Sequence, residues 1–405
     1  MSTTSTVAPE RSATVGADRF RSLDGLRGVA ALVVLVHHTL LVTPAMSAVV
    51  MPGGEPPQPG SALWWLTYSP LKLTNAGPEA VVLFFVLSGF VLALPVLRGG
   101  FNWAAYFPRR VVRLMVPVAG AVALASLLIL LHPQTLVPGA SRWLDMASTP
   151  QLTWASVLSA LDLLNGQYQI DNPLWSIQWE MIFSLALPVF GIIAIVVKRW
   201  WVVGIAACLV GVWIGALTGT ASFLYLPVFM IGVLLAVGLE GVTKLIAVIN
   251  AVRYSWLIWA AAVTAGLLLL IARWLVGPEA MAASWMPPLL TALIPVGALL
   301  IVVSALGSRL CGRILTLRPA RFAGRISFSL YLVHVPLIVA IRHLMPDVSL
   351  GIFMLIVIPI ALILATGFYY LVEAPAHVLS GRAGRWGARV LSGTPAAAAS
   401  APTQS

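Results

Sequence analysis

The chain has 405 residues, of which 60% are hydrophobic and only 9% are charged, with a formal net charge of +11. A soluble globular domain carries about 25% charged residues. This composition, with a mean hydropathy of +0.96, therefore excludes a soluble globular protein, a disordered chain and a coiled coil. It predicts an integral membrane protein, and two cysteines are too few for a disulfide framework.

Ten apolar segments are long enough to cross a bilayer, whose hydrocarbon core of about 30 Å needs roughly 20 helical residues. The sequence therefore predicts an all-α, polytopic membrane protein with about ten transmembrane helices. The expected spans are 23–43, 77–97, 108–131, 174–197, 201–219, 222–239, 256–276, 285–306, 325–344 and 350–373.

The distribution of positive charge predicts the orientation. With the N-terminus in the cytoplasm, twenty of the 24 basic residues fall on the cytoplasmic side, and the exceptions are Lys72, Arg142, Arg273 and Arg342. Membrane proteins keep Lys and Arg in their cytoplasmic loops. We therefore expect both termini in the cytoplasm, and the net charge requires no nucleic-acid partner.

The chain divides into one membrane domain and two tails. Residues 1–18 are rich in Ser, Thr, Ala and Pro, as is the end of the chain, which predicts a disordered cytoplasmic tail at 1–18 and a largely disordered one at 377–405. The membrane domain is then 19–376. Of the external loops, we expect 44–76 to be irregular because of its prolines, whereas 132–173 contains an apolar run that could form an interfacial helix.

The first span contains charged residues, which are rare in membrane segments and mark functional sites. Arg27 and His38 are eleven residues apart, so they lie on one helical stripe about 16 Å apart along the axis, whereas His37 lies about 80° away. Asp24 is three residues before Arg27 and can pair with it. We therefore expect His38, not His37, to share a cavity with Arg27. The alternative is that both histidines only make hydrogen bonds within the helix bundle.

Two further segments have both a structural and a functional interpretation. Ser88 and Gly89 in the second span favour close helix packing. Arg110 and Arg113 share a helix face at the cytoplasmic edge of the third span. They either anchor the helix by the positive-inside rule or bind phosphate oxygens, and their spacing alone supports both interpretations equally.

The fourth span places a carboxylate close to the depth of His38. Glu180 lies about 9 Å below the external face, and His38 about 8 Å below it. A carboxylate beside an imidazole fixes its tautomer and raises its basicity. Glu180 is therefore a candidate partner of His38, provided that the two helices are neighbours.

The ninth span carries a polar stripe of Ser327, Tyr331 and His334, spaced i, i+4 and i+7. This stripe either joins helices by hydrogen bonds or lines a substrate cavity. Glu373, at the end of the tenth span, is interpreted as a charged stop. No metal-ligand spacing is present, and Cys208 and Cys311 are interpreted as inert.

These segments together resemble the membrane-bound acyltransferase-3 family over roughly 19–376. The resemblance rests on Leu23-Asp24-Gly25-Leu26-Arg27-Gly28 with His38, Phe84-Phe85-Val86-Leu87-Ser88-Gly89-Phe90, Arg110-x-x-Arg113 with Pro117, Leu174-Trp175-Ser176 with Glu180, Ser327-x-Ser329-x-Tyr331-x-x-His334 and Glu373-x-Pro375. Members of this bacterial family move acetyl or longer acyl groups onto carbohydrates, cell-envelope polymers and macrolides.

The resemblance implies roles for individual residues. The Arg and His of the first motif are the essential pair of the family, which implies these roles for Arg27 and His38. Many members have an acidic residue just before Leu-Phe-Phe, where this chain has Val82. Glu79 is one turn earlier, and the acidic role is not transferred to it. The extracytoplasmic hydrolase-like domain that some polymer-acylating members have is absent from this sequence.

The resulting hypothesis is an integral-membrane O-acyltransferase without a tightly bound cofactor, in a bacterial inner or plasma membrane. Acyl-CoA is the donor substrate, with its phosphates held by Arg110 and Arg113 and also by Arg27. His38 is the general base on the acceptor hydroxyl. Glu180 or Asp24 orients the site, and Trp175, Ser327, Tyr331 and His334 line it, with Tyr331 and His334 as candidates for oxyanion stabilisation.

The sequence alone is compatible with several acceptors, two reaction routes and two other classes of protein. The acceptor is a carbohydrate, a cell-envelope glycan or glycolipid, or a macrolide, entering from either side of the membrane, and a transient acyl-His38 is an alternative to direct transfer. A transporter or exporter also fits ten spans, but transporters often show paired halves with broken helices, and no such symmetry is found. A non-catalytic membrane scaffold fits the spans too, but it gives no reason for Arg27 and His38 to share a stripe.

Overall fold

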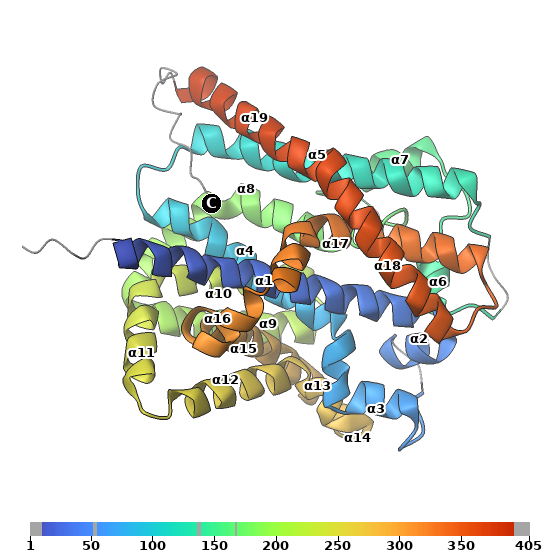
Figure 1. Ribbon diagram of the computed structural model, residues 1–405, viewed down its shortest axis with the longest axis horizontal. Helices are drawn as coiled ribbons and strands as arrows, with labels where there is room; N and C mark the ends of the chain where they lie inside the picture. Colours follow the sequence, from blue (N-terminus) through green and yellow to red (C-terminus); the bar gives the residue numbers. More distant parts are fainter. Residues whose placement is uncertain (1–9, 52–54, 136–138, 167, 393–405) are drawn as a thin grey trace, which may run out of the picture.

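A computed structural model describes residues 10–51, 55–135, 139–166 and 168–392, and within these ranges the chain is helical with no strand (Figure 1). Eight helical stretches are long and apolar enough to cross a membrane, or nine if a bent pair is one span. The protein is therefore a polytopic all-α membrane protein. The stretches contain α1 (Glu10–Leu41), α4 (Gly77–Leu97), α5 (Trp103–Leu131), α8 (Leu174–Val196), η2 (Lys198–Trp200) with α9 (Trp201–Thr218), α15 (Met286–Gly307), α17 (Arg318–Leu344) and α18 (Leu350–Phe368).

Each of the ten expected spans coincides with a helix, but two of these helices are too short for a full span. α10 (Ala221–Val237) has 17 residues and turns by 69° into α11 (Leu239–Ala251), and α12 (Ser255–Leu270) has 16 residues. At 1.5 Å per residue, 16 residues reach only about 24 Å. All ten expected segments are therefore helical, but in the described chain only eight of them, or nine if the bent pair counts as one, are long enough to cross the membrane.

Glycine contacts allow the central helices to approach closely. α1 crosses the middle of the bundle and packs against α17 and α4 (Figure 1). A Cβ atom on Gly28 of α1 would lie only 2.4 Å from the backbone nitrogen of Gly324 in α17. In the same way, a Cβ on Gly89 of α4 would lie 2.1 Å from the carbonyl oxygen of Phe229 in α10. The Ser-Gly pair of the second span thus has the packing role expected for its glycine.

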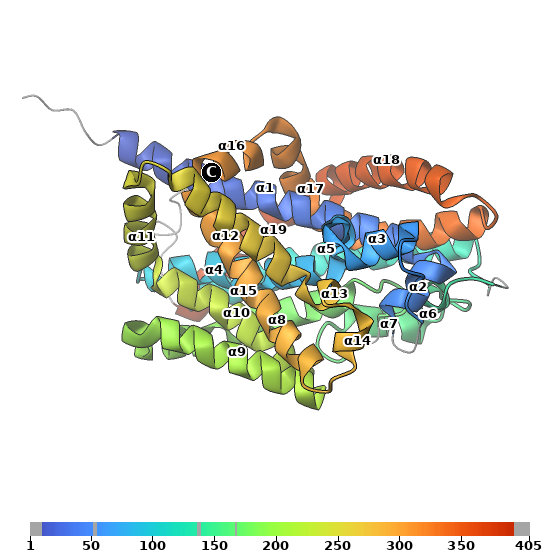
Figure 2. The same cartoon turned by 90° about the horizontal axis from the view of Figure 1, so that it is seen from below.

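Two layers flank this centre. In Figure 2, α9 lies beside α10, and α12 lies against α15 in the same view, in agreement with the extensive contacts of both pairs. On another side, α18 continues through one π-helical turn, η3 (Tyr369–Glu373), into α19 (Ala374–Ser392), which packs along α5 (Figure 1).

The expected tails are more ordered than their composition suggests. α1 already begins at Glu10, and residues 377–392 form part of α19 instead of a disordered tail. The reason is packing: Gly384 and Gly387 let α19 approach the backbone of α5 at Ala105 and Ala104. Residues 1–9 and 393–405 of the predicted tails lie outside the described residues.

Short helices cover the end of the bundle at which α1 stops, which we call the histidine end because it carries His38. They are α2 (Pro44–Val50), α3 (Ala62–Tyr68), η1 (Pro70–Asn75), α6 (Arg142–Ala147), α7 (Trp154–Leu161), α13 (Ala272–Leu275) and α14 (Gly277–Met281). The expected irregular loop 44–76 therefore contains three short helices. α7 lies in the apolar run of 132–173 and exposes Trp154 and Leu158. α16 (Arg309–Leu315) precedes α17 at the opposite end.

Candidate active site

Two histidines from neighbouring helices form a direct pair. Nε2 of His334 in α17 lies 3.0 Å from Nδ1 of His38 in α1. His334 is buried, and its own Nδ1 lies 3.0 Å from the carbonyl oxygen of Leu330 and 2.8 Å from that of Tyr331. Since carbonyl oxygens only accept hydrogen bonds, Nδ1 of His334 must carry a proton, and Nε2 of the neutral ring is then an acceptor.

This pairing fixes the tautomer of His38. Nδ1 of His38 donates to Nε2 of His334 and also lies 3.1 Å from the carbonyl oxygen of Val34, which again requires a proton on Nδ1. The lone pair of His38 is therefore on Nε2, which makes no hydrogen bond to any residue that the structure describes. An imidazole with this tautomer can accept a proton from a substrate hydroxyl.

His37 is directed elsewhere, as expected from the helical phase. Its Nδ1 lies 2.8 Å from the carbonyl oxygen of Asn75, and its ring packs so closely on Gly77 that a Cβ there would lie 2.6 Å away. The ring of His38 instead faces Trp143 of α6, with centroids 5.4 Å apart. Only His38 of the two neighbouring histidines contacts His334.

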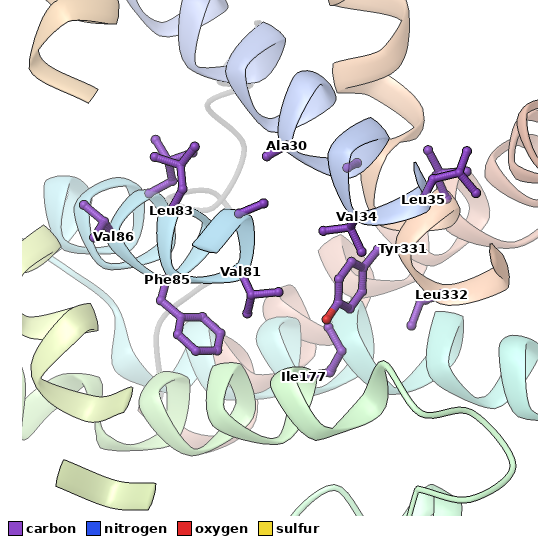
Figure 3. Close-up of a cluster of buried hydrophobic side chains, with 14 of the residues drawn as sticks. Ala30, Val34, Leu35, Val81, Leu83, Phe85, Val86, Ile177, Tyr331 and Leu332 are labelled. Atoms are coloured by element: carbon purple, nitrogen blue, oxygen red, sulfur yellow. The ribbon is translucent and has the colours of Figure 1, made fainter. Parts of the chain in front are cut away.

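A narrow cavity with about 30 Å³ of free space lies between α1, α4, α8 and α17. It is lined by Arg27, Val81, Phe84, Phe85, Ser88, Ser176, Ile177, Glu180, Ser327, Phe328 and Tyr331. Figure 3 shows Tyr331 crossing from α17 toward Ile177 of α8. His38 does not line this cavity, contrary to the expectation that it shares one with Arg27. It lies behind Tyr331, whose ring centroid is 5.7 Å from that of His334.

Hydroxyl groups form a short chain at this boundary. The hydroxyl oxygens of Tyr331 and Ser176 are 2.6 Å apart, and Ser176 donates to the carbonyl oxygen of Pro173 at 3.1 Å. Because the proton of Ser176 is used for Pro173, Tyr331 must be the donor to Ser176. Tyr331 therefore presents lone pairs, not a free proton, to the cavity, which favours a positioning role over oxyanion stabilisation.

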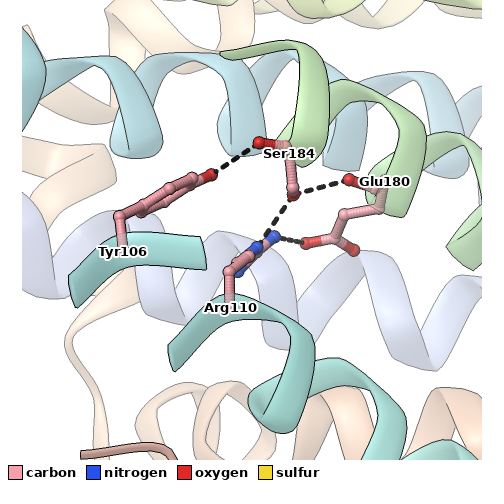
Figure 4. A network of polar contacts seen from close by, with 4 residues as sticks. All are labelled: Tyr106, Arg110, Glu180 and Ser184. Carbon is pink, nitrogen blue, oxygen red and sulfur yellow. Dashed lines mark hydrogen bonds and ion pairs between the residues drawn. The ribbon is translucent and has the colours of Figure 1, made fainter. Parts of the chain in front are cut away.

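Glu180 is held by Arg110 and does not contact His38. Nη2 of Arg110 is 2.5 Å from Oε1 of Glu180, and Nε donates to Oγ of Ser184 at 2.8 Å (Figure 4). Tyr106 completes the network by donating to the carbonyl oxygen of Ser184 at 3.1 Å. The expected pairing of Glu180 with His38 is wrong because α8 packs against α4, α5 and α10, and the neighbour of α1 is α17. Two donors of Arg110 are also occupied by this network.

The remaining charged candidates gather at the opposite, arginine end of the cavity. Arg113 interacts electrostatically with Arg110, Arg27, Glu180 and Glu373. Arg27 lines the cavity and makes no hydrogen bond to another described residue.

Asp24 is exposed, although it is three residues from Arg27. Their expected pairing does not form an ion pair within the described ranges. At Asp24 the backbone is the packing contact instead, because a Cβ on Gly324 would lie 2.2 Å from its carbonyl oxygen.

Two motif residues have roles different from those expected. Trp175 does not line the cavity but packs in an aromatic cluster, with ring centroids 6.4 Å from Phe85 and 5.3 Å from Tyr225. Glu373 is not an exposed stop: it is buried and accepts hydrogen bonds from the backbone nitrogen of Ser329 at 3.1 Å and its hydroxyl at 2.5 Å. Its partner Ser329 lies on α17, the helix that also carries the polar stripe. An additional serine on that helix is the sequence signal that could have indicated this contact.

Sequence reasoning missed a buried charged cluster at the histidine end. Lys72 is fully buried, donates to Oδ1 of Asn75 at 2.8 Å and lies 4.1 Å from the ring centroid of Trp274. Glu79 is also buried and accepts a hydrogen bond from the indole nitrogen of Trp274 at 2.9 Å. Burial lowers the pKa of Lys72 to about 8, Glu79 opposes this shift, and Arg273 adds to it. No spacing rule would have found this cluster.

Asp171 is a second buried group that the sequence did not indicate. It directly precedes α8, is fully buried, and neither carboxylate oxygen has a partner in the described part of the chain. Burial raises the pKa of its carboxyl group well above the ordinary value. Burial thus favours the neutral form of this carboxyl group, which can donate a hydrogen bond as well as accept one.

Among the described residues, no three His, Cys, Asp or Glu side chains gather in a way that could hold a metal ion.

The profile of the family described as acyltransferase domain matches residues 20–373. Acyltransferase MdmB of Streptomyces mycarofaciens is 31% identical over 196 residues, and these cover 47% of this chain and 45% of that protein. The similarity thus extends over less than half of that relative. No solved structure is significantly similar to the chain.

Proposed function

Because this chain belongs to the acyltransferase family whose profile spans residues 20–373, we propose that it transfers an acyl group from acyl-CoA to a hydroxyl group, with His38 as the general base. The observation that carries this proposal is the His38–His334 pair, in which two backbone carbonyls fix the protons of both rings and leave the lone pair of His38 on Nε2. Proton abstraction by a base prepared in this way contributes about 10²- to 10⁴-fold to a rate.

In the proposed step, Nε2 of His38 takes the proton of the acceptor hydroxyl while the hydroxyl oxygen attacks the thioester carbon. The tetrahedral intermediate then collapses, the carbon–sulfur bond breaks, and the CoA sulfur leaves with the proton from His38. His334 keeps its proton on Nδ1 and accepts from His38 throughout. A histidine that is held in one orientation needs no reorganisation when its charge changes.

The arginine end of the cavity is suited to the anionic part of the donor. Arg27 and Arg113 are candidates for phosphate binding, because Arg27 lines the cavity and Arg113 lies close to it. Arg110 has a smaller share in this than expected, since Glu180 and Ser184 occupy two of its donors. Arg27 and His38 are about 16 Å apart along α1, a separation that the pantetheine arm of acyl-CoA can bridge.

The acceptor is a hydroxyl-bearing carbohydrate, a cell-envelope glycan or glycolipid, or a macrolide. The transferred group is an acetyl or a longer acyl group. The charge distribution of the loops supports cytoplasmic termini and entry of acyl-CoA from the cytoplasm in a bacterial plasma membrane. His38 then lies toward the external side, where acyl transfer would occur.

The test is thioester consumption by the purified protein in lipid nanodiscs, with thiol release from acetyl-CoA and longer acyl-CoA measured together with acylated product. We expect His38→Ala to reduce transfer by about 10³-fold or more without changing the amount of protein in the membrane. His37→Ala should be milder, and His132→Ala, which follows α5 and does not line the cavity, should match wild type. Full activity of His38→Ala would refute the assignment of the base.

A further inference from the structure

A second pocket lies at the histidine end, away from the cavity that contains Arg27. This outer pocket has a volume of about 420 Å³ and lies between the C-terminal end of α2 with Met51, residues in and directly after α14, and Tyr68, Arg273 and Trp274. Its size is in the range of small-molecule sites, about 300–1,000 Å³. None of its lining residues belongs to the motifs of the first, ninth or tenth span.

Buried charges fix the indole wall of the outer pocket. The indole nitrogen of Trp274 donates to Glu79 at 2.9 Å, and the ammonium group of Lys72 lies 4.1 Å from the ring centroid. Both charged residues are buried, and a buried charge is costly unless other groups bind it. Here they hold Trp274 in one orientation, so the pocket has a preformed aromatic wall.

The lining combines a mainly aliphatic surface with a few polar groups. The residues from α2 and α14 are aliphatic, Tyr68 lies beside Trp274 with ring centroids 6.4 Å apart, and the guanidinium of the exposed Arg273 is 5.2 Å from the indole. An apolar body would bury its surface against the aliphatic side. Arg273 and the Tyr68 hydroxyl can bind oxygen atoms at its edge. A wholly hydrophilic saccharide would leave most of this lining unsatisfied.

Two sets of contacts connect the outer pocket with His38. Through α2, Ser47 accepts a hydrogen bond from the backbone nitrogen of Trp143 at 3.0 Å, and the ring of Trp143 faces His38. On the other side, Lys72 binds Asn75, whose carbonyl oxygen binds His37, the neighbour of His38. α2 and Lys72, which support the walls of the outer pocket, thus also hold Trp143 and His37, the neighbours of His38.

We propose that the outer pocket binds the apolar body of an amphipathic acceptor, a glycoside whose sugar hydroxyl is then presented to His38. This inference rests on the proposed function and narrows it: among the possible acceptors, it selects those in which a sugar is attached to a large apolar group. Arg273 and Trp274 are binding residues for the acceptor and take no part in proton transfer.

The test compares two acceptor probes with the full-length protein in nanodiscs: erythromycin, a macrolide glycoside, and maltopentaose, a hydrophilic oligosaccharide. We expect erythromycin to be bound and acylated in preference to maltopentaose. Ala282→Trp, which fills the pocket from α14, should raise the KM for erythromycin at least tenfold and leave the KM for acetyl-CoA and acceptor-independent thioester hydrolysis within twofold. Ala260→Trp, on an exposed face of α12, is the matched control and should match wild type in all three.

The outcomes separate this inference from the proposed function. Preference for maltopentaose, or an unchanged KM for erythromycin in Ala282→Trp, would overturn the outer pocket while leaving acyl transfer intact. If wild type consumes no thioester, the proposed function fails, and equilibrium dialysis of erythromycin still decides on the pocket. Binding that Ala282→Trp abolishes would support it, and absence of binding to wild type would overturn it.

Discussion

The two ends of the bundle satisfy their polar groups in different ways. At the arginine end, charged groups face charged partners, as in the 2.5 Å contact of Arg110 with Glu180. At the histidine end, the hydrogen-bond and ring partners are neutral: His334 and His38 bind backbone carbonyls and each other, and Lys72 binds an amide oxygen and an aromatic ring. The arginines whose donors are not taken up by such a pair can bind anions, whereas neutral partners leave an imidazole free to gain and lose a proton.

The proposed donor-binding residue, Arg27, and the proposed base, His38, therefore lie at different heights along α1. α1 carries Arg27 near its middle and His38 in its last turn, and Tyr331 lines the cavity beside Arg27 while its ring lies 5.7 Å from that of His334. If acyl-CoA is the donor, as proposed, it can be anchored by its charge at a distance from the reacting carbonyl. Interactions remote from the reaction can supply the free energy that positions the thioester.

The largest effect should come from breaking the charged pair. Arg110→Ala leaves Glu180 without its partner in a site where the two side chains are 11% and 19% exposed. Removal of one member of a buried pair costs about 3–5 kcal/mol, so we expect a loss of this order in the free energy of unfolding in nanodiscs. The double variant Arg110→Ala, Glu180→Gln should recover part of it.

The matched control is the exposed pair of Lys244 and Glu240, whose side chains are 74% and 83% exposed. Exposed pairs contribute about 0–1 kcal/mol, so Lys244→Ala should change the free energy of unfolding little. If Arg110→Ala were as mild as Lys244→Ala, the arginine end would not depend on charge pairing, and the contrast between the two ends would be lost.

At the histidine end, the buried Lys72 makes stability depend on pH. Its pKa of about 8 in the folded protein is below the ordinary 10.5, so the folded state binds fewer protons between these values than the unfolded state. Stability must therefore rise as the pH increases from about 8 to about 10.5, by at most about 3 kcal/mol. Lys72→Met removes this contribution.

The measurement is the difference in thermal unfolding midpoint between wild type and Lys72→Met from pH 7 to pH 10. Wild type should gain stability relative to the variant as the pH rises, because its ammonium group no longer resists burial. The exposed Lys198, substituted as Lys198→Met, should give a constant difference. A constant difference for Lys72→Met as well would mean that its ammonium group is solvated in the folded protein.

Much of the architecture could be predicted from the sequence because it depends on properties of single helices. Hydropathy located every apolar helix that is long enough to cross a membrane, and helical phase separated His38 from His37 without knowledge of any neighbour. The Ser88-Gly89 pair indicated a close helix contact, and the structure places it between α4 and α10. These features follow from the periodicity of one element and require no tertiary information.

The partners of the polar groups could not be predicted because they depend on which helices touch. Equal depth suggested Glu180 as the partner of His38, but His38 contacts His334 of α17, and Glu180 contacts Arg110 of α5. His334 was correctly placed on a polar stripe, yet its pairing with His38 required the crossing of two helices at Gly28 and Gly324. Lys72, in a short external segment, gave no sign that it is fully buried.

The histidine pair predicts a graded effect of substitutions at His334. His334→Ala removes the acceptor of the His38 Nδ1 proton, so the His38 ring loses its fixed tautomer and orientation. Partners that orient a reacting side chain contribute about 10- to 100-fold, and we expect a decrease of that size in kcat with the KM for acyl-CoA within twofold. His334→Gln, which keeps an acceptor oxygen at similar reach, should retain more activity than His334→Ala.

A control for His334 is available on the same helix. His343 is also buried, but its nitrogen atoms bind the carbonyl oxygens of Val339 and Thr135, remote from His38. His343→Gln should therefore lower stability more than kcat. Equal kcat values for His334→Ala and wild type would show that Val34 alone is sufficient to hold His38.

The smallest effect, and the most selective for the arginine end, is expected from Arg113. If Arg113 binds donor phosphate, Arg113→Ala should raise the KM for acyl-CoA about tenfold, the equivalent of one charge-assisted hydrogen bond, and change kcat less than threefold. Arg113→Lys keeps the charge but loses bidentate geometry and should fall in between. The neighbouring Arg109 is exposed, so Arg109→Ala should leave the KM unchanged. If Arg109→Ala raised the KM as much, the donor would sense the overall positive charge of this end, not a site built around Arg113.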